Sequence, residues 1–179
     1  MSSANIVVVG GGTGNHTTLS GLRGRDCNLA AVVAMTDSGG SSGRLRDEMG
    51  HLPPGDLRQC LIALASSDHS GEIMKKLFDY RFNAGNGLAG HNFGNLLLTA
   101  LTEITGNTVT AIEEASRLLG IDGSVLPVTL TDATLVAKLA DGSELAGESE
   151  AAPPSLASKG AHGRAACCRD FTFGRGPGT

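Results

Sequence analysis

Two glycine-rich segments of the chain have the residue types and the spacing that bind phosphate groups. The first is Gly10-Gly11-Gly12-Thr13-Gly14, after the apolar residues 6–9, and the second is Thr36-Asp37-Ser38-Gly39-Gly40-Ser41-Ser42-Gly43, after the apolar residues 30–35. Glycine lets backbone N–H groups approach an anion without a Cβ atom in the way, and a helix that begins there adds its positive end. The apolar runs are typical of buried parallel strands, so the two segments predict a phosphate-bearing ligand at the carboxyl ends of adjacent strands.

Charged side chains near the second segment are candidates for the same site. Asp37 stands where dinucleotide-binding folds use an acidic residue for a ribose hydroxyl. Arg44 and Arg46 either donate to phosphate oxygens or lie on a solvated helix face. For Arg58 we expect a surface or structural role.

The segment His91-Asn92-Phe93-Gly94-Asn95 opens an expected helix. Asn92 is a suitable N-cap for it, and Asn95 follows three residues later on the same face. We expect at least one of these two amides to contact the ligand. His91 has no carboxylate partner in the sequence pattern, which favours a structural role over acid–base chemistry.

Composition limits the class of protein and of partner. The 179 residues suffice for one domain with a core, and a formal net charge of −4 argues against nucleic acid as a partner. We expect no insertion into a membrane and no signal peptide, since no apolar run could span a bilayer and the N-terminus leads almost directly into a strand. The four cysteines lack a C-x-x-C spacing, which favours free thiols over a zinc site. Because free thiols are typical of a reducing compartment, we expect a cytoplasmic protein.

Apolar periodicity and turn residues predict alternating strands and helices. The helices are expected near 15–23 (capped by Thr13 or Asn15), 44–49, 57–64 (capped by Asp56), 71–81, from Asn92 onward, and at 109–119. The strands are expected near 5–10, 29–36 and 125–130, the last at an edge or bulge because of Pro127, with a hairpin of 135–139 and 144–147 around Asp141-Gly142. The first two strands and the helix between them form a βαβ unit.

The character of the chain changes near residue 150. Residues 150–179 are rich in Ala, Gly, Arg and Pro and show neither helical nor strand periodicity, which predicts a disordered or mispacked tail. The sequence therefore divides into residues 1–149 and an anomalous segment, 150–179.

Five motifs in order resemble the CofD/YvcK-like family of Rossmann-type proteins over about residues 5–149. They are residues 8–14, 37–46, 52–58, 77–82 and 90–97. The resemblance implies an α/β, Rossmann-like three-layer fold with a mostly parallel sheet, here incomplete at the C-terminus. Residues 41–44 and 53–64 are typical of the YvcK branch, often called gluconeogenesis factor.

The YvcK branch implies a regulatory protein that binds a nucleotide sugar such as UDP-N-acetylglucosamine, with roles in gluconeogenic growth and cell shape. Two alternatives stay open. One is a CofD-like transferase of a phospholactyl-type group from a nucleotide-diphosphate donor, dependent on a divalent metal. The other is a non-functional fragment. A homo-oligomer is a further candidate assembly.

The resemblance also suggests that Asp37 and Asp56 hold a metal such as Mg²⁺ together with ligand phosphate oxygens. The chain departs from the family in two respects. Many members have a second acidic residue where this chain has Ser38, and members run to about twice the matched length. A truncated or frameshifted reading frame is the explanation we favour for residues 150–179.

Overall fold

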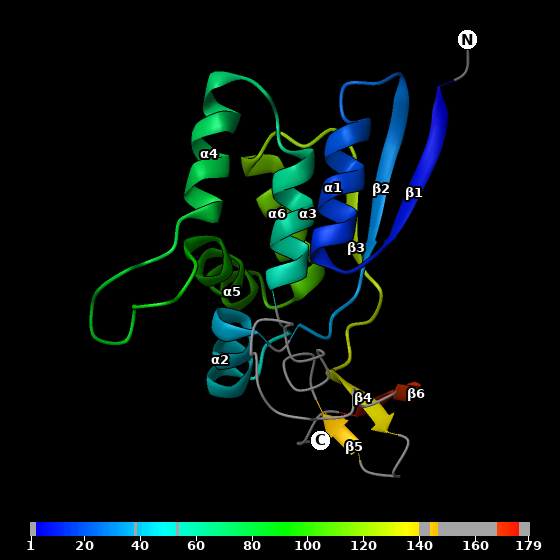
Figure 1. Ribbon diagram of the computed structural model, residues 1–179. Helices are drawn as coiled ribbons and strands as arrows, with labels where there is room; N and C mark the ends of the chain where they lie inside the picture. The colour runs from blue at the N-terminus through cyan, green and yellow to red at the C-terminus, as the bar shows by residue number, and fades with distance from the viewer. Residues whose placement is uncertain (1–2, 38, 53, 140–143, 147–167, 176–179) are drawn as a thin grey trace, which may run out of the picture.

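A parallel three-stranded sheet forms the centre of the molecule, which is a computed structural model that describes residues 3–37, 39–52, 54–139, 144–146 and 168–175. The strands β1 (Ala4–Gly10), β2 (Cys27–Val33) and β3 (Ser124–Pro127) lie in that order. Their pairing confirms the expected α/β class and βαβ unit (Figure 1). The strands β2 and β3 end earlier than predicted, and Pro127 lies on an edge strand as expected.

The helices of the described residues are α1 (Gly12–Leu22), α2 (Gly40–Met49), α3 (Gly55–Leu64), α4 (His69–Asp79), α5 (Phe93–Thr105) and α6 (Thr108–Leu118). Most of them begin earlier than predicted, and the difference is largest for α1 and α2. The helix α1 begins inside the first glycine segment, with Gly11 as its N-cap, so neither Thr13 nor Asn15 caps it. The helix α2 begins inside the second segment, with Gly39 as its N-cap. Both glycine segments therefore supply the first turn of a helix as well as a loop.

The capping residues were predicted correctly for α5 and wrongly for α3. The side chain of Asn92 caps α5 by accepting from the Asn95 backbone N–H at 3.2 Å. Pro54 is the N-cap of α3, and Asp56 lies inside the first turn instead. The helix α4 begins at His69, because Asp68 accepts from the Gly71 N–H at 2.7 Å and fixes its start.

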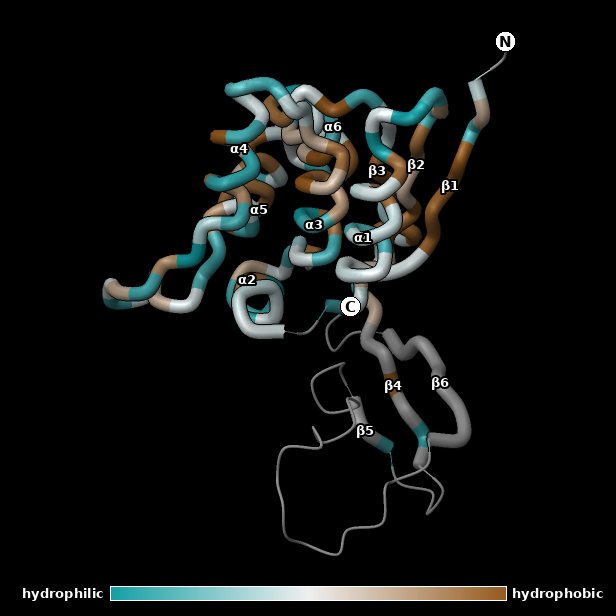
Figure 2. Tube along the Cα trace, turned by 45° about the horizontal axis from the view of Figure 1, so that its top comes forward, coloured by the Kyte–Doolittle hydropathy of each residue, from teal (hydrophilic) through white to brown (hydrophobic). Residues whose placement is uncertain are grey.

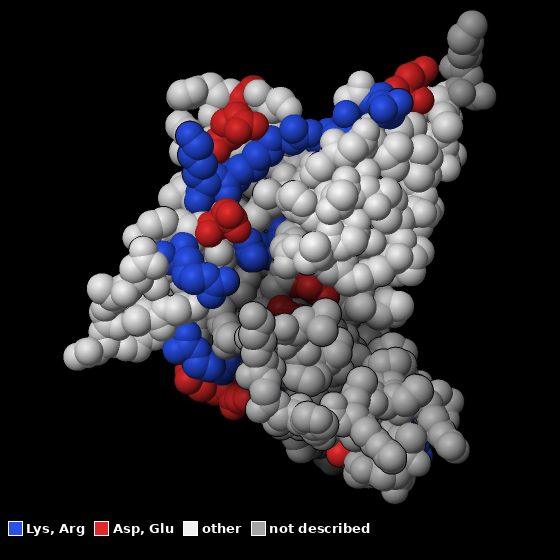
Figure 3. Space-filling view, in the orientation of Figure 1, with Lys and Arg blue, Asp and Glu red and all other residues white. Residues whose placement is uncertain are grey.

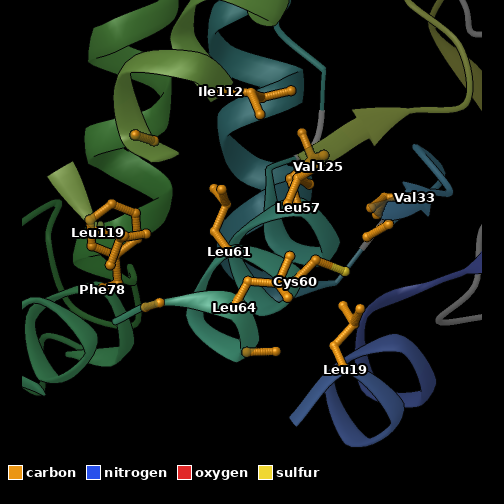
Figure 4. Close-up of a cluster of buried hydrophobic side chains, with 14 of the residues drawn as sticks. Leu19, Val33, Leu57, Cys60, Leu61, Leu64, Phe78, Ile112, Leu119 and Val125 are labelled. Carbon is orange, nitrogen blue, oxygen red and sulfur yellow. The ribbon is translucent and has the colours of Figure 1, made fainter. Parts of the chain in front are cut away.

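The hydrophobic core lies between the helices and one face of the sheet. Figure 4 shows Cys60 and Leu61 of α3 at its centre, between Leu19 of α1 and Ile112 of α6. Both α3 residues are fully buried. This packing holds the amino ends of α1 and α3 close to each other.

The other face of the parallel sheet is apolar and open in the described part of the chain. Val7 and Val9 of β1 are 59% and 71% exposed, and Leu126 of β3 is 48% exposed. Figure 2 shows the apolar colour along β1. The helices thus cover a single face of these strands, where a three-layer fold would cover both.

A second sheet contains β4 (Ala133–Leu139), β5 (Glu144–Ala146) and β6 (Cys168–Arg175) in the order β5-β4-β6. The antiparallel pairing of β4 with β5 confirms the expected hairpin, whose turn at 141–142 lies outside the described residues. The expectation of a disordered or mispacked tail over 150–179 does not hold for residues 168–175, which form β6 and pair with β4. Long-range pairing specifies this strand, and local periodicity does not reveal it. Residues 150–167 and 176–179 lie outside the described residues.

Candidate functional site

A pocket of about 260 Å³ lies at the amino end of α2. We call it the α2 pocket, and its lining residues are Asp37, Gly39, Gly40, Ser41, Ser42, Gly55, Arg58, Gln59, Arg81 and Asn95. Figure 3 shows acidic atoms at the floor of a hollow in this face of the molecule and basic atoms along its rim. The second glycine segment therefore lines a cavity, together with residues of α3 and α5.

The first turn of α2 presents backbone donors to this pocket. No side chain caps the helix. The carboxylate of Asp37 accepts from the Gly39 N–H at 2.9 Å, one residue before the helix begins. The first N–H groups of a helix have no intrahelical acceptor, and the helix dipole places partial positive charge there. This end of the pocket suits an anion.

The two serines of the first turn have different partners. Ser41 Oγ accepts from the Asn92 backbone N–H and lies 3.2 Å from Nδ1 of His91, so its hydroxyl links α2 to α5. Ser42 Oγ accepts from Nδ2 of Asn95 at 3.2 Å, a bond that does not use the Ser42 proton. Of the two hydroxyls expected to bind phosphate, that of Ser42 is the better placed to donate to a ligand.

Two arginines that the sequence analysis did not assign to the site line the pocket. Arg58 is buried, and its Nη1 atom donates to Oδ1 of Asp79 at 2.8 Å. Arg81 donates from Nη1 to the Gly90 carbonyl at 2.7 Å. A Cβ atom at Gly94 would stand 2.8 Å from Cδ of Arg58, so that glycine leaves room for the side chain. A glycine at position 94, inside the helix that the segment 91–95 opens, was the sequence signal that another side chain packs closely against α5.

The arginines that the sequence suggested lie elsewhere. Arg44 donates to the Ala89 carbonyl at 3.1 Å. Arg46 pairs with the adjacent Asp47, with 3.1 Å between Nη2 and Oδ1. Neither lines the α2 pocket.

The first glycine segment adjoins a different cavity. Gly10 and Thr36 line an apolar pocket of about 450 Å³ on the open face of the sheet. The buried Asn15 donates from Nδ2 to the carbonyls of Gly10 and Val32, at 3.2 and 3.4 Å, and so fixes the end of β1 against β2. Farther along, Thr13 is exposed and Gly14 faces open space. The first glycine segment therefore does not line the α2 pocket, but Gly10 shares this apolar pocket with Thr36 of the second segment.

Both candidate metal ligands belong to the surroundings of the amino end of α3. A Cβ atom at Gly55 would overlap Oδ2 of Asp37, and Asp56 is the next residue along α3. The described residues contain no group of three or more His, Cys, Asp or Glu side chains that could hold a metal. Two carboxylates fit Mg²⁺ only if ligand oxygens and water complete its shell, which is how nucleotide sites hold this ion.

Burial lowers the pKa of His91, and the nearby charge of Arg44 lowers it further. The imidazole beside Ser41 is therefore neutral at pH 7. Burial also raises the pKa of the Cys60 thiol to about 11, and the negative charge of Asp56 contributes to this rise. Burial is the main cause of both pKa shifts, so both side chains lie in the packed interior of the protein.

Comparison with known proteins gives one family. A family model described as 2-phospho-L-lactate transferase CofD matches residues 6–163. A provisionally named gluconeogenesis factor of Nostoc sp. is 54% identical over 144 residues, which cover 80% of this chain and 31% of the relative. The gluconeogenesis factor of Bacillus subtilis is 44% identical over 144 residues, covering 80% of this chain and 44% of its own.

Solved structures agree with the fold. A crystal structure of a Bacillus halodurans protein has a TM-score of 0.75 at 44% identity and covers 82% of this chain and 46% of that one. A second crystal structure of the same Bacillus halodurans protein, described as a member of the UPF0052 family, has a TM-score of 0.81 at 36% identity and covers 97% of this chain and 51% of that one. The chain thus spans about a third to a half of the length of the relatives it matches. Within the described residues, no helix is long and apolar enough to cross a membrane.

Proposed function

The chain belongs to the family described as 2-phospho-L-lactate transferase CofD, and on that basis we propose that it binds a nucleotide with a diphosphate group. A nucleotide sugar of the UDP-N-acetylglucosamine type is the ligand we favour. One observation carries the proposal, namely that the α2 pocket combines an uncapped helix N-terminus with the Ser42 hydroxyl and two guanidinium groups. Backbone donors at a helix start and arginine forks are the groups that bind phosphate in proteins.

The biological role follows the resemblance to the YvcK branch. We extend the proposal to a cytoplasmic regulatory protein that acts in growth on gluconeogenic carbon sources and in cell shape. The similarity to proteins named gluconeogenesis factor supports the first of these roles. A homo-oligomer remains part of the proposal.

Isothermal titration calorimetry tests ligand binding directly. UDP-N-acetylglucosamine, UDP and GDP are titrated into the full chain with Mg²⁺, after a cooperative thermal transition shows that the sample is folded. Saturable heat with UDP-N-acetylglucosamine supports the proposal. A folded sample that gives no heat with any of the three overturns it.

A CofD-like transferase is the second candidate, and the carboxylate of Asp37 beside the first turn of α3, which contains Asp56, favours it. A Mg²⁺ ion there would neutralise the charge that develops as the P–O–P bridge of the donor breaks and a nucleoside monophosphate leaves. Asp37 would then anchor the cation beside the first turn of α2, and the arginines would orient the phosphate. The test is transfer of a phospholactyl-type group from a guanosine diphosphate donor. Unchanged turnover in the double variant Asp37→Asn, Asp56→Asn excludes this mechanism.

A further inference from the structure

A negatively charged side chain of the protein itself, that of Asp56, lies against the first glycine segment. Gly11 caps α1 without any side-chain hydrogen bond from its own helix. A Cβ atom at Gly11 would stand 3.1 Å from Oδ2 of Asp56, and one at Gly12 would overlap Oδ1 of the same side chain. The carboxylate of Asp56 therefore packs directly on the amino end of α1, where a ligand phosphate would have to bind.

The surroundings of Asp56 hold it in this position. A Cβ atom at Gly12 would also stand 2.8 Å from Nε2 of Gln59, so two side chains of α3 cover the loop together. The helices α1 and α3 lie side by side (Figure 1). Asp56 also lies in the first turn of α3, so the positive ends of two helices stabilise its negative charge.

This placement has a consequence for phosphate binding. A phosphate that approaches Gly11 and Gly12 meets a negative charge at the position it would occupy, and like charges at contact distance repel strongly in a partly buried site. A divalent cation reverses the situation, because the carboxylate of Asp37 lies against Gly55 at the amino end of α3 and offers a second carboxylate there. With a cation between them, the Asp56 carboxylate gains a partner away from α1.

We propose that Asp56 is a cation-dependent gate on the first glycine segment. Without a divalent cation, Asp56 caps α1 and excludes ligand phosphate. With a cation–nucleotide pair, Asp56 turns toward Asp37 and leaves the N–H groups of the first segment to the phosphate. This inference rests on the proposed binding of a nucleotide diphosphate and assigns a regulatory role to a residue otherwise regarded as a metal ligand.

Titrating UDP into the full chain, once with EDTA and once with excess Mg²⁺, tests the gate. For the unaltered chain we expect binding with Mg²⁺ that weakens on the order of tenfold in EDTA. Asp56→Asn removes the repulsive charge, so its affinity in EDTA should rise on the order of tenfold and its dependence on Mg²⁺ should be lost. Its melting temperature without ligand should fall, because α1 loses a charged cap.

Three further variants make the test specific. In Asp37→Asn, Mg²⁺ should no longer raise the affinity for UDP, and the affinity in EDTA should be no higher than that of the unaltered chain. Asp68→Asn changes a carboxylate that caps α4 and lies outside the α2 pocket, and it should leave both affinities unchanged. If Asp56→Asn does not fold, Asp56→Ser retains a short oxygen cap without the charge.

The possible results separate the two proposals. If the unaltered chain is folded and binds no nucleotide in either buffer, the proposed function fails. If the unaltered chain binds UDP, but in EDTA the uncharged variants at position 56 bind UDP no more tightly than the unaltered chain, the gate is wrong and the proposed function stands.

Discussion

Ser42 and Asn95 lie 53 residues apart in the chain, and Nδ2 of Asn95 donates to Oγ of Ser42 over 3.2 Å. Both side chains are about 3% exposed. The bond joins the first turn of α2 to the first turn of α5, so the two motifs that carry these residues meet at one pocket. Since the serine acts as the acceptor, its own proton is left for a ligand oxygen.

Ser42→Ala should weaken nucleotide binding by about ten- to a hundredfold, because a hydrogen bond to a charged phosphate oxygen contributes ~1.5–3 kcal/mol. Calorimetry with UDP-N-acetylglucosamine measures the change. Ser41→Ala is the matched control, since it is equally buried but its hydroxyl bonds to His91 and Asn92. The control should lower the melting temperature and change the affinity little. The reverse pattern would contradict the assignment of Ser42 as the ligand donor.

Arg81→Ala should lower nucleotide affinity by at least about tenfold, because it removes a charged donor from the α2 pocket. The melting temperature should hardly change, since Arg81 is exposed and, among the described residues, its side chain donates only to the Gly90 carbonyl. Arg44→Ala is the control, because Arg44 donates to the neighbouring Ala89 carbonyl and lies outside the pocket lining. Equal losses of affinity in the two variants would show only a general effect of charge.

Arg58→Ala should instead reduce stability and affinity together. The side chain is buried, its guanidinium group pairs with Asp79, and its Cδ methylene lies against Gly94. Truncation leaves a cavity and removes the partner of Asp79, so we expect a loss of ~1–3 kcal/mol in the free energy of unfolding. Chemical denaturation and calorimetry on one preparation measure both effects. A variant of native stability would show that Arg58 does not support the fold.

Local patterns indicated the residues of the α2 pocket that lie in continuous motifs and missed those that depend on helix packing. Asp37, Ser42 and Asn95 stand beside glycines or helix caps, whose geometry sequence spacing can indicate. Arg58 and Arg81 reach the same pocket only because α3 and the segment after α4 lie next to α2 and α5. The strand β6 was missed for a similar reason, since its pairing partner β4 lies far away in sequence.

Stability should decrease as the pH falls below the ordinary pKa of histidine, because His91 is neutral and buried beside Ser41. Burial and Arg44 lower its pKa in the folded state, so below about pH 6.5 the unfolded chain binds more protons at this position than the folded chain. The contribution of His91 to the free energy of unfolding is constant above that pH. It decreases as the pH falls from there to the lowered pKa of His91 in the folded state. Melting temperatures between about pH 5 and 8 measure this slope, and His91→Gln should flatten it. An equal slope in the variant would assign the effect to other groups.

Gly12 and Gly14 lie in the first turn of the same helix and should respond in opposite ways to alanine. At Gly14 the added methyl group meets open space, so the better helix propensity of alanine should stabilise the fold by up to ~1 kcal/mol. At Gly12 it overlaps Asp56 and crowds Gln59, so overpacking should cost ~1–3 kcal/mol. Urea denaturation of the two variants measures the difference, and the combination Gly12→Ala with Asp56→Ser should recover part of the loss. Two variants of equal stability would mean that Asp56 does not pack on the start of α1, which would remove the basis for the gate as well.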